Sequence, residues 1–221
     1  GFFPEIGAGL YDACRASVDI SSYWSNILTI ARDMAVKSLF AGKVWQNDYD
    51  FLIVRSAATA CERRLNVYRD LNTFVAFKPY RPFVLRSGPA ISSENEVRAW
   101  ASLILVSGGS LVLADRLRLL NARGRRILNV VLRYSDDTPG RPLDLLSADI
   151  PRVWYKSRPD GGLLAVFNWT DRASTLPALA LEALGIRARR GYELWSGEAQ
   201  PLAAIAVAAR DAKVFHIRSD G

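Results

Sequence analysis

The sequence predicts an α/β protein in which strands and helices alternate first and antiparallel strands follow. Up to about residue 135, short apolar segments alternate with stretches whose apolar residues recur every three or four positions. This alternation is typical of parallel strands covered by helices. After the Pro139-Gly140-Arg141-Pro142 segment, short strand-like runs are separated by Gly, Pro and Asp residues, a pattern typical of an antiparallel sheet.

The first part begins with a predicted strand over residues 9–15 and a predicted helix after it. The segment Asp19-Ile-Ser-Ser has the composition of a helix start, and Gly42 is expected to end the helix. Residues 43–46 form the next predicted strand, which leads into an acidic loop at residues 47–50. The helix itself is predicted from apolar residues at helical spacing: Trp24, Ile27, Leu28, Ala31, Met34, Ala35 and Leu39.

A second helix is predicted from residue 94 to residue 106. Ser92 and Ser93 precede Glu96 in the pattern of an N-terminal cap. The pair Gly108-Gly109 is typical of a helix end, because glycine readily adopts the backbone angles found there. We therefore expect both ends of this helix to be set by local sequence.

A long irregular segment over residues 56–93 precedes this helix, and a strand and a helix follow it. Segments of such length without regular structure often border a functional site. A strand over residues 110–114 and a basic helix over residues 116–133 complete three strand–helix units.

The second part contains four predicted strands, at residues 152–157, 163–169, 192–195 and 212–218. Asp160-Gly161-Gly162 lies between the first two and predicts a hairpin turn. The change in composition places a domain boundary near residue 145, which divides the chain into residues 1–145 and 146–221. We expect the second domain to be an antiparallel β-sandwich.

The net charge of +7 does not predict a nucleic-acid partner, because its 24 arginines and 5 lysines are scattered through every segment. The densest cluster, at Arg123, Arg125 and Arg126, has no interleaved aromatic residues that could stack on bases. The longest apolar runs, at residues 99–106 and 202–209, are too short to cross a bilayer. Neither nucleic acid nor a membrane is therefore an expected partner.

The scarcity of histidine and cysteine restricts the possible chemistry. His216 is the single histidine and lies in a predicted strand, while Cys14 and Cys61 lack the spacing of a metal site. Ser-His-Asp catalysis, Cys-His catalysis and histidine-bound zinc are excluded. Catalysis must then use carboxylates, and we expect no metal or cofactor.

Polar residues follow three of the predicted strands: Arg15 and Asp19, then the segment from Trp45 to Asp50, then Gly108-Gly109 with Asp115 after the next strand. Functional side chains of a parallel barrel gather at such positions. Each group also has a structural interpretation: Asp19 could be a helix cap, Asn47-Asp48 a turn, and Gly108-Gly109 a helix stop. Three such groups in succession favour the functional interpretation.

The motifs R-x-S-x-D…W, W-x-N-D-x-D-x(4)-R and E-x(11)-GG resemble the α-galactosidases of glycoside hydrolase families 27 and 36. The likeness covers about residues 4–135 through motifs and the remainder through architecture and the phrase Val166-Phe-Asn-Trp-Thr. It implies a (β/α)8 TIM barrel, of which this chain holds about the last three βα units, followed by an antiparallel β-domain. Tyr49 departs from the family, which usually has proline there, and this puts the shape of the loop in question.

The resemblance implies roles for individual residues. Asp19 matches the general acid/base and Arg15 the arginine that contacts the sugar. Asp50 matches a residue of the sugar pocket, Phe51 an apolar wall, and Trp45 suits a sugar face. Asp48 is expected to be structural, and Trp24 to lie in the core. The substrate implied is an α-galactoside or a related oligosaccharide, but the residues cannot fix the sugar.

The family's nucleophile, carried in a Lys-x-Asp setting on an earlier strand, has no match before Arg15. Three βα units cannot close a barrel. We therefore expect a partial chain that is inactive alone and that assembles with a missing N-terminal part of the barrel. Two alternatives are a non-catalytic carbohydrate-binding or interaction remnant and a basic nucleic-acid-binding protein. No signal peptide is visible, which slightly favours the cytoplasm, but the compartment stays open.

Overall fold

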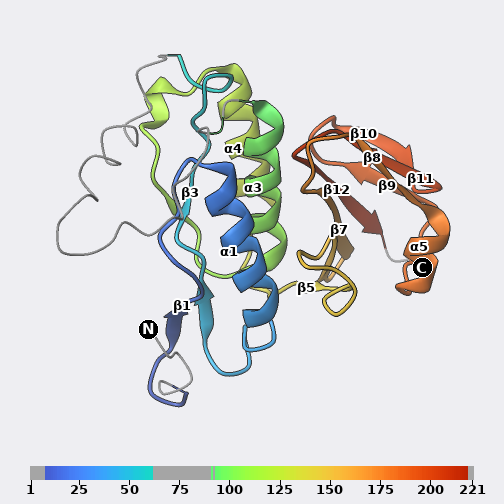
Figure 1. Ribbon diagram of the computed structural model, residues 1–221, viewed down its shortest axis with the longest axis horizontal. Helices are drawn as coiled ribbons and strands as arrows, with labels where there is room; N and C mark the ends of the chain where they lie inside the picture. Colours follow the sequence, from blue (N-terminus) through green and yellow to red (C-terminus); the bar gives the residue numbers. More distant parts are fainter. Residues whose placement is uncertain (1–7, 62–90, 92, 219–221) are drawn as a thin grey trace.

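The computed structural model describes residues 8–61, 91 and 93–218 (Figure 1). Its three long helices are α1 (Trp24–Lys37), α3 (Glu94–Ser107) and α4 (Ala122–Tyr134). Short parallel strands lie on one side of these helices and an antiparallel sheet lies on the other (Figure 1). No helix within the described residues is both long enough and apolar enough to span a membrane.

The parallel strands form two pairs, β1 (Ala13–Arg15) with β2 (Gln46–Asp48) and β3 (Phe51–Leu52) with β4 (Val112–Leu113). Only Tyr49 and Asp50 separate β2 from β3, so one stretch of chain pairs with β1 at its start and with β4 at its end. The register sets Arg15 opposite Asp48. The carboxyl ends of β1 and β2 therefore lie side by side, as the strand–helix alternation predicts.

The antiparallel sheet has six strands in the order β10-β9-β12-β7-β6-β5. Its two central strands, β7 and β12, pair over their full lengths, and buried apolar residues pack on both faces of this pair. The strands are β5 (Arg141–Pro142), β6 (Val153–Arg158), β7 (Gly161–Asn168), β9 (Arg190–Glu193), β10 (Glu198–Pro201) and β12 (Asp211–Arg218).

A second layer of the antiparallel part is a separate strand pair, β8 (Ser174–Pro177) with β11 (Ala204–Val207), joined to the short helix α5 (Ala178–Ala183). Apolar side chains from this pair and from one face of the sheet form a core of their own, which includes Val153, Leu164, Ile205 and Phe215. The strand-rich C-terminal part that the sequence predicts is confirmed.

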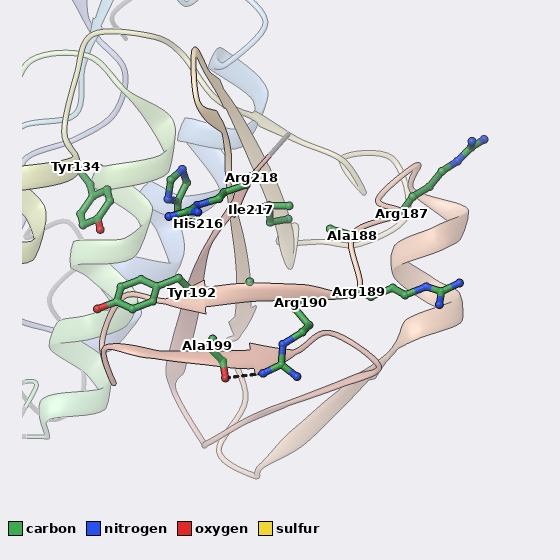
Figure 2. Close-up of a pocket in the computed structure, with 11 residues that line it drawn as sticks. Tyr134, Arg187, Ala188, Arg189, Arg190, Tyr192, Ala199, His216, Ile217 and Arg218 are labelled. Carbon is green, nitrogen blue, oxygen red and sulfur yellow. Dashed lines mark hydrogen bonds between the residues drawn. The ribbon is translucent and has the colours of Figure 1, made fainter. Parts of the chain in front are cut away.

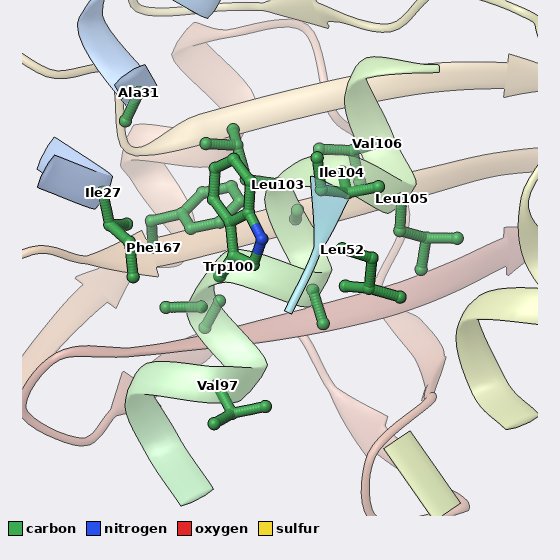
Figure 3. Packing of buried hydrophobic residues seen from close by; sticks show 14 of the residues in the cluster. Ile27, Ala31, Leu52, Val97, Trp100, Leu103, Ile104, Leu105, Val106 and Phe167 are labelled. Atoms are coloured by element: carbon green, nitrogen blue, oxygen red, sulfur yellow. The ribbon is translucent and has the colours of Figure 1, made fainter. Parts of the chain in front are cut away.

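Helix α3 packs against both sides of the molecule. It contacts β3 on one side and β6, β7 and β12 on the other, as well as α1 and α4. Figure 3 shows Trp100 near Leu52 of β3 and Phe167 of β7, and Trp100 Nε1 donates a hydrogen bond to the carbonyl of Phe51 at 3.2 Å. Because it has partners all round, α3 is buried along almost its whole length.

The ends of α3 follow the sequence prediction closely. The Ser93 Oγ accepts a hydrogen bond from Glu96 N at 3.2 Å, and Ser93 N donates to the Glu96 carboxylate at 3.1 Å, which is a capping box. Gly108 ends the helix with a φ of 72°, in the region that favours glycine. Ser92 lies outside the described residues, as does most of the predicted long segment at 56–93.

Helix α1 was predicted wrongly at both ends. It begins at Trp24 rather than at Asp19-Ile-Ser-Ser, and its first residue is preceded by Tyr23, which makes no side-chain capping bond. The interpretation of Asp19 as a helix cap is therefore wrong. The helix ends at Lys37, and turns carry the chain on to Gly42.

Other boundaries also differ from the predictions. Of the strand predicted at residues 9–15, only the last three residues form a strand, β1. The strand predicted at residues 43–46 begins later, so that Asn47 and Asp48 belong to β2. The basic helix is split, since a 3₁₀ helix at Leu117–Leu119 precedes Asn121, which caps α4. The β6–β7 hairpin turns at Pro159-Asp160, one residue earlier than expected, because Gly161 already pairs with Arg158.

The domain boundary near residue 145 and the assignment of the first part to a barrel stay predictions. Strand β5, at Arg141–Pro142, already pairs with β6 of the antiparallel sheet.

Candidate functional site

The candidate site is built around Arg15, the last residue of β1. Its Nε lies 3.0 Å from the carboxylate of Asp48, and its Nη1 lies 3.2 Å from that of Asp19 and 3.2 Å from that of Asp50. One guanidinium thus joins three carboxylates at the carboxyl ends of two parallel strands. The first two predicted polar groups therefore converge on one place.

Asp50 is the most constrained member of this cluster. It has a φ of 70°, which is unusual for a residue other than glycine. Its Oδ2 accepts a hydrogen bond from Ile20 N at 2.7 Å, and its backbone N donates to Asp48 Oδ1 at 2.8 Å. Within the described part of the chain, its Oδ1 is buried and has no hydrogen-bond partner.

The burial of Asp50 has an electrostatic effect. Burial raises the pKa of Asp50 above its ordinary value, while the hydrogen bond from Ile20 and the charge of Arg15 oppose the rise. A buried carboxylate oxygen without a donor is costly in free energy. Asp50 Oδ1 is therefore an unused acceptor among the described residues.

Asp19 lies in the loop between β1 and α1, with 80% of its side chain exposed. The loop is fastened by Asn26 in the first turn of α1, because Asn26 Oδ1 accepts from Ser21 N at 2.6 Å and Asn26 Nδ2 donates to the Asp19 carbonyl at 3.3 Å. Asp19 is thus positioned through its backbone while its carboxylate meets solvent and Arg15. Nothing in the local sequence pattern indicated this role for Asn26.

The expected apolar wall and sugar-face residues lie in different places. Phe51 directly follows Asp50 in the chain, is partly exposed, and pairs in register with the partly exposed Val112. Trp45 precedes β2, at the opposite end of that strand from Asp48. It is buried, stacks on Phe40, and donates to Asn47 Oδ1 at 2.9 Å.

The structure therefore brings Arg15, Asp19 and Asp50 together, with Phe51 next to Asp50 in the chain, but it does not place Trp45 with them. The ring of Trp45 is occupied by neighbours of its own chain, which gives it the position of a packing residue. Trp24, expected in the core, is buried there.

Asn47 and Tyr49 give the loop after β2 its shape. Asn47 Nδ2 donates to the Lys37 carbonyl at 2.9 Å and to the Tyr49 hydroxyl at 2.8 Å. Burial raises the pKa of Tyr49 to about 12, against the effect of the bond from Asn47. Tyr49 is therefore a neutral core residue, and its hydroxyl is held by Asn47.

Asp115 of the third predicted polar group forms an ion pair with Arg55, the last residue of the W-x-N-D-x-D-x(4)-R motif. The Nη1 of Arg55 lies 2.6 Å from Asp115 Oδ1, and Asp115 Oδ2 accepts from Val54 N at 2.6 Å. Both side chains are buried at the carboxyl ends of β3 and β4. This pair fixes the strand ends beside the cluster.

No group of three or more His, Cys, Asp or Glu residues in the described ranges is arranged to hold a metal ion. The arrangement around Arg15 can instead bind hydroxyl groups through carboxylates and a guanidinium, and it can donate or accept a proton at the exposed Asp19.

Comparison with known proteins gives matches among solved structures only. No family model matches the sequence, and no curated protein matches it. A glycoside hydrolase family 27 β-L-arabinopyranosidase from Geobacillus stearothermophilus, in complex with arabinose, matches with a TM-score of 0.68 and 16% identity, over 100% of this chain and 50% of that chain.

Two α-galactosidases give similar matches. For α-galactosidase I from Mortierella vinacea the TM-score is 0.60 and the identity 12%, over 96% of this chain and 55% of that chain. For the α-galactosidase from Saccharomyces cerevisiae the TM-score is 0.56 and the identity 12%, over 95% of this chain and 60% of that chain. The chain thus spans about half the length of the solved structures it matches. At these identities the likeness is one of fold, and it confirms the predicted resemblance at that level.

Proposed function

We propose that this chain is the C-terminal part of a retaining glycoside hydrolase that acts on α-galactosides or related glycosides. In this proposal Asp19 is the general acid/base, Arg15 and Asp50 hold the sugar, and Phe51 forms an apolar wall. The fold likeness to glycoside hydrolases supports the class of reaction. The chain's own residues support the place where it would occur.

The observation that carries the proposal is the convergence on Arg15. Its guanidinium lies 3.2 Å from both Asp19 and Asp50, and these two carboxylates come from loops after different strands. In parallel α/β folds, ligands bind at the carboxyl ends of the strands. A sugar hydroxyl at this place could donate to the exposed Asp19 carboxylate or accept from the partly exposed Arg15.

The proposed chemistry proceeds in two steps. Asp19 gives its proton to the glycosidic oxygen while a second carboxylate, about 5 Å away, attacks the anomeric carbon and forms a glycosyl–enzyme intermediate. Asp19 then takes a proton from the water that hydrolyses this intermediate. The second carboxylate would belong to the other half of the protein, in the region that the solved structures have and this chain does not.

The parallel strands support the proposed assembly with that region. Each described parallel pair has a free edge, at β1 and at β4, and parallel sheets normally continue with strands on both sides. We propose that these strands belong to a TIM barrel completed by the N-terminal part of the enzyme, and that the chain alone does not hydrolyse its substrate.

The test is to measure Asp19→Asn in the complete protein. Hydrolysis of unactivated galactosides should fall by about 10²–10⁴-fold, the usual contribution of general acid catalysis. Nitrophenyl galactoside should lose much less, because its leaving group needs no proton. Equal losses on both substrates would contradict the acid role. Binding of galactose without hydrolysis by the wild type would favour the non-catalytic alternative.

A further inference from the structure

A cavity of about 720 Å³ lies in the antiparallel part, where α4 ends at Tyr134 (Figure 2). It is separate from the Arg15 cluster and belongs to the region of β9, β10 and β12. Its volume falls in the range of pockets that hold small organic ligands.

The floor of the cavity is one face of the sheet. Tyr192 of β9 pairs in register with His216 of β12, so their side chains lie on the same face. Arg190 precedes Tyr192 by two residues and Arg218 follows His216 by two residues, so both arginines share that face. Gly161 of β7 is opposite Arg218 and offers no side chain. The sheet surface is therefore open beside Arg218.

The lining is positively charged. Four arginines border the cavity, and no carboxylate side chain of the described ranges lines it. None of Arg187, Arg189, Arg190 and Arg218 forms an ion pair with residues 8–61, 91 or 93–218. The single hydrogen bond found there for their side chains runs from Arg190 Nη2 to the Ala199 carbonyl at 3.3 Å (Figure 2).

The carboxylate of Asp160, which lies beside the lining residue His216, is already engaged by other basic groups. Asp160, in the β6–β7 turn, lies 3.2 Å from His216 Nε2 and 3.5 Å from Arg158 Nε, so two other basic groups already share it. By contrast, the arginines of the candidate site and of the α3 interface are each paired with acids. Within the part of the chain that the structure describes, the cavity thus presents guanidinium groups that have no carboxylate partner at a concave surface, which attracts anions.

Two tyrosines add flat apolar surface to this charge. Tyr192 is 44% exposed, and Tyr134 stands across from it at the end of α4 (Figure 2). Both also border a second hollow of about 400 Å³, whose other lining residues include Arg125, Arg126 and Arg133 of α4. The positive surface therefore continues from one hollow to the next, as a chain-like anion would require.

We propose that this Tyr–Arg cavity is a binding site for an acidic saccharide, with uronate carboxylates held by Arg190 and Arg218 and a sugar ring against Tyr192. Guanidinium groups match carboxylates in a two-bond geometry, and aromatic faces suit the apolar face of a sugar. The choice of a saccharide over other anions rests on the proposed function, since a glycoside hydrolase with a second binding site would use it to hold a saccharide.

The test is a calorimetric titration of this chain with a galacturonate tetramer. Arg190→Gln and Arg218→Gln should each raise the Kd about tenfold or more, the effect of losing a hydrogen bond to a charged group. Tyr192→Ala should raise it about three- to tenfold. The matched control is Arg141→Gln, an exposed arginine on β5 at the opposite edge of the sheet, which should leave the Kd within about twofold.

Three results would overturn the proposal: no binding of the galacturonate tetramer, an equal Kd for a neutral galactose tetramer, or equal losses in the Arg141 control. Tighter binding of a thymidylate oligomer of the same charge would instead assign the surface to nucleic acid. The titration does not depend on hydrolysis, and Asp19→Asn should leave it unchanged. Failure of this site and failure of the catalytic proposal can therefore be told apart.

Discussion

The Nη1 of Arg15 lies 3.2 Å from Oδ2 of Asp50, and it provides a counter-charge for a carboxylate whose side chain is only 3% exposed. Arg15→Met keeps the apolar stem and removes the charge. The free energy of unfolding should fall by about 1–3 kcal/mol, less than for a fully buried pair because solvent screens the arginine. Arg15 itself is 35% exposed.

Urea denaturation at neutral pH measures this loss. Arg141→Met, at an exposed arginine, is the control and should change the free energy of unfolding by less than about 0.5 kcal/mol. A similar loss in both variants would show that the Arg15–Asp50 contact does not stabilise the fold.

Asp50→Asn should change how stability depends on pH. Because burial raises the pKa of Asp50 in the folded state, the folded protein holds this proton more tightly than the unfolded chain. The contribution to stability is full below the unfolded pKa of about 4 and is lost as pH rises through the folded pKa. The stability of the variant relative to the wild type should therefore increase as pH rises.

Asp149→Asn provides a control of opposite sign for this measurement. The hydrogen bond from Arg32 lowers the pKa of Asp149, so its contribution is present above the unfolded pKa and is lost as pH falls. Relative to the wild type, this variant should lose stability as pH rises. The same trend in both variants would contradict the assignment for Asp50.

Lys156 is a fully buried lysine that connects α3, the segment after α4, and β6. Its Nζ lies 2.7 Å from Asp136 Oδ1, 3.1 Å from the Asp136 carbonyl and 3.3 Å from the Leu105 carbonyl. Lys156→Met should lower the free energy of unfolding by about 2–4 kcal/mol, somewhat less than for a buried charge left alone. The loss is smaller because Asp136 retains a second ion pair, in which Arg158 Nη1 lies 2.7 Å from Asp136 Oδ2.

Chemical denaturation of Lys156→Met against Lys43→Met checks this expectation. Lys43 is exposed, and its replacement should have an effect below about 0.5 kcal/mol. A loss for Lys156→Met as small as that of the control would mean that solvent reaches the lysine.

Asn168, the last residue of β7, begins an Asn-Trp-Thr glycosylation sequon, but its side chain is buried and hydrogen-bonded. Its Nδ2 donates to the carbonyls of Arg172, Val207 and Ala208. Asn168→Asp replaces the donor by a charged acceptor that faces these carbonyls. The free energy of unfolding at neutral pH should fall by about 3 kcal/mol or more.

Asn129→Asp makes the same change at an exposed position of α4 and should alter stability by less than about 0.5 kcal/mol. Thermal unfolding of the two variants compares them directly. A glycan attached at Asn168 in the folded protein would contradict this account of the side chain.

Local patterns predicted the parts of the fold in which a residue acts on its neighbours in sequence. The capping box of Ser93 and Glu96 and the long β6–β7 hairpin are of this kind. The start of α1 was missed because Asn26, inside the helix, holds the preceding loop through Ser21 and Asp19. Strands β8, β10 and β11 have four residues each and depend on tertiary pairing, which a short run does not reveal.

In the candidate site, too, sequence patterns predicted some residues, while others depend on tertiary contacts. Motif spacing selected Arg15, Asp19 and Asp50, and the parallel register brings them together. Spacing alone could not place Trp45, because its position at the amino end of β2 depends on where that strand begins. The hydrogen bond from Ile20 N to Asp50 and the lone buried Oδ1 arise from loops 30 residues apart, so no local pattern could indicate them.

Helix α3 has a consequence for how this protein could be recombined with others. Its Arg98 is paired with Asp211 of β12 at 2.6 Å, and its Ser102 accepts a hydrogen bond from Trp195 Nε1 at 3.1 Å, while Trp100 reaches the backbone of β3. The helix precedes the expected boundary near residue 145 but forms part of the antiparallel half's core. A chimera made by exchanging everything after that boundary would separate these partners, so a successful graft must carry α3 along or redesign the surface that receives it.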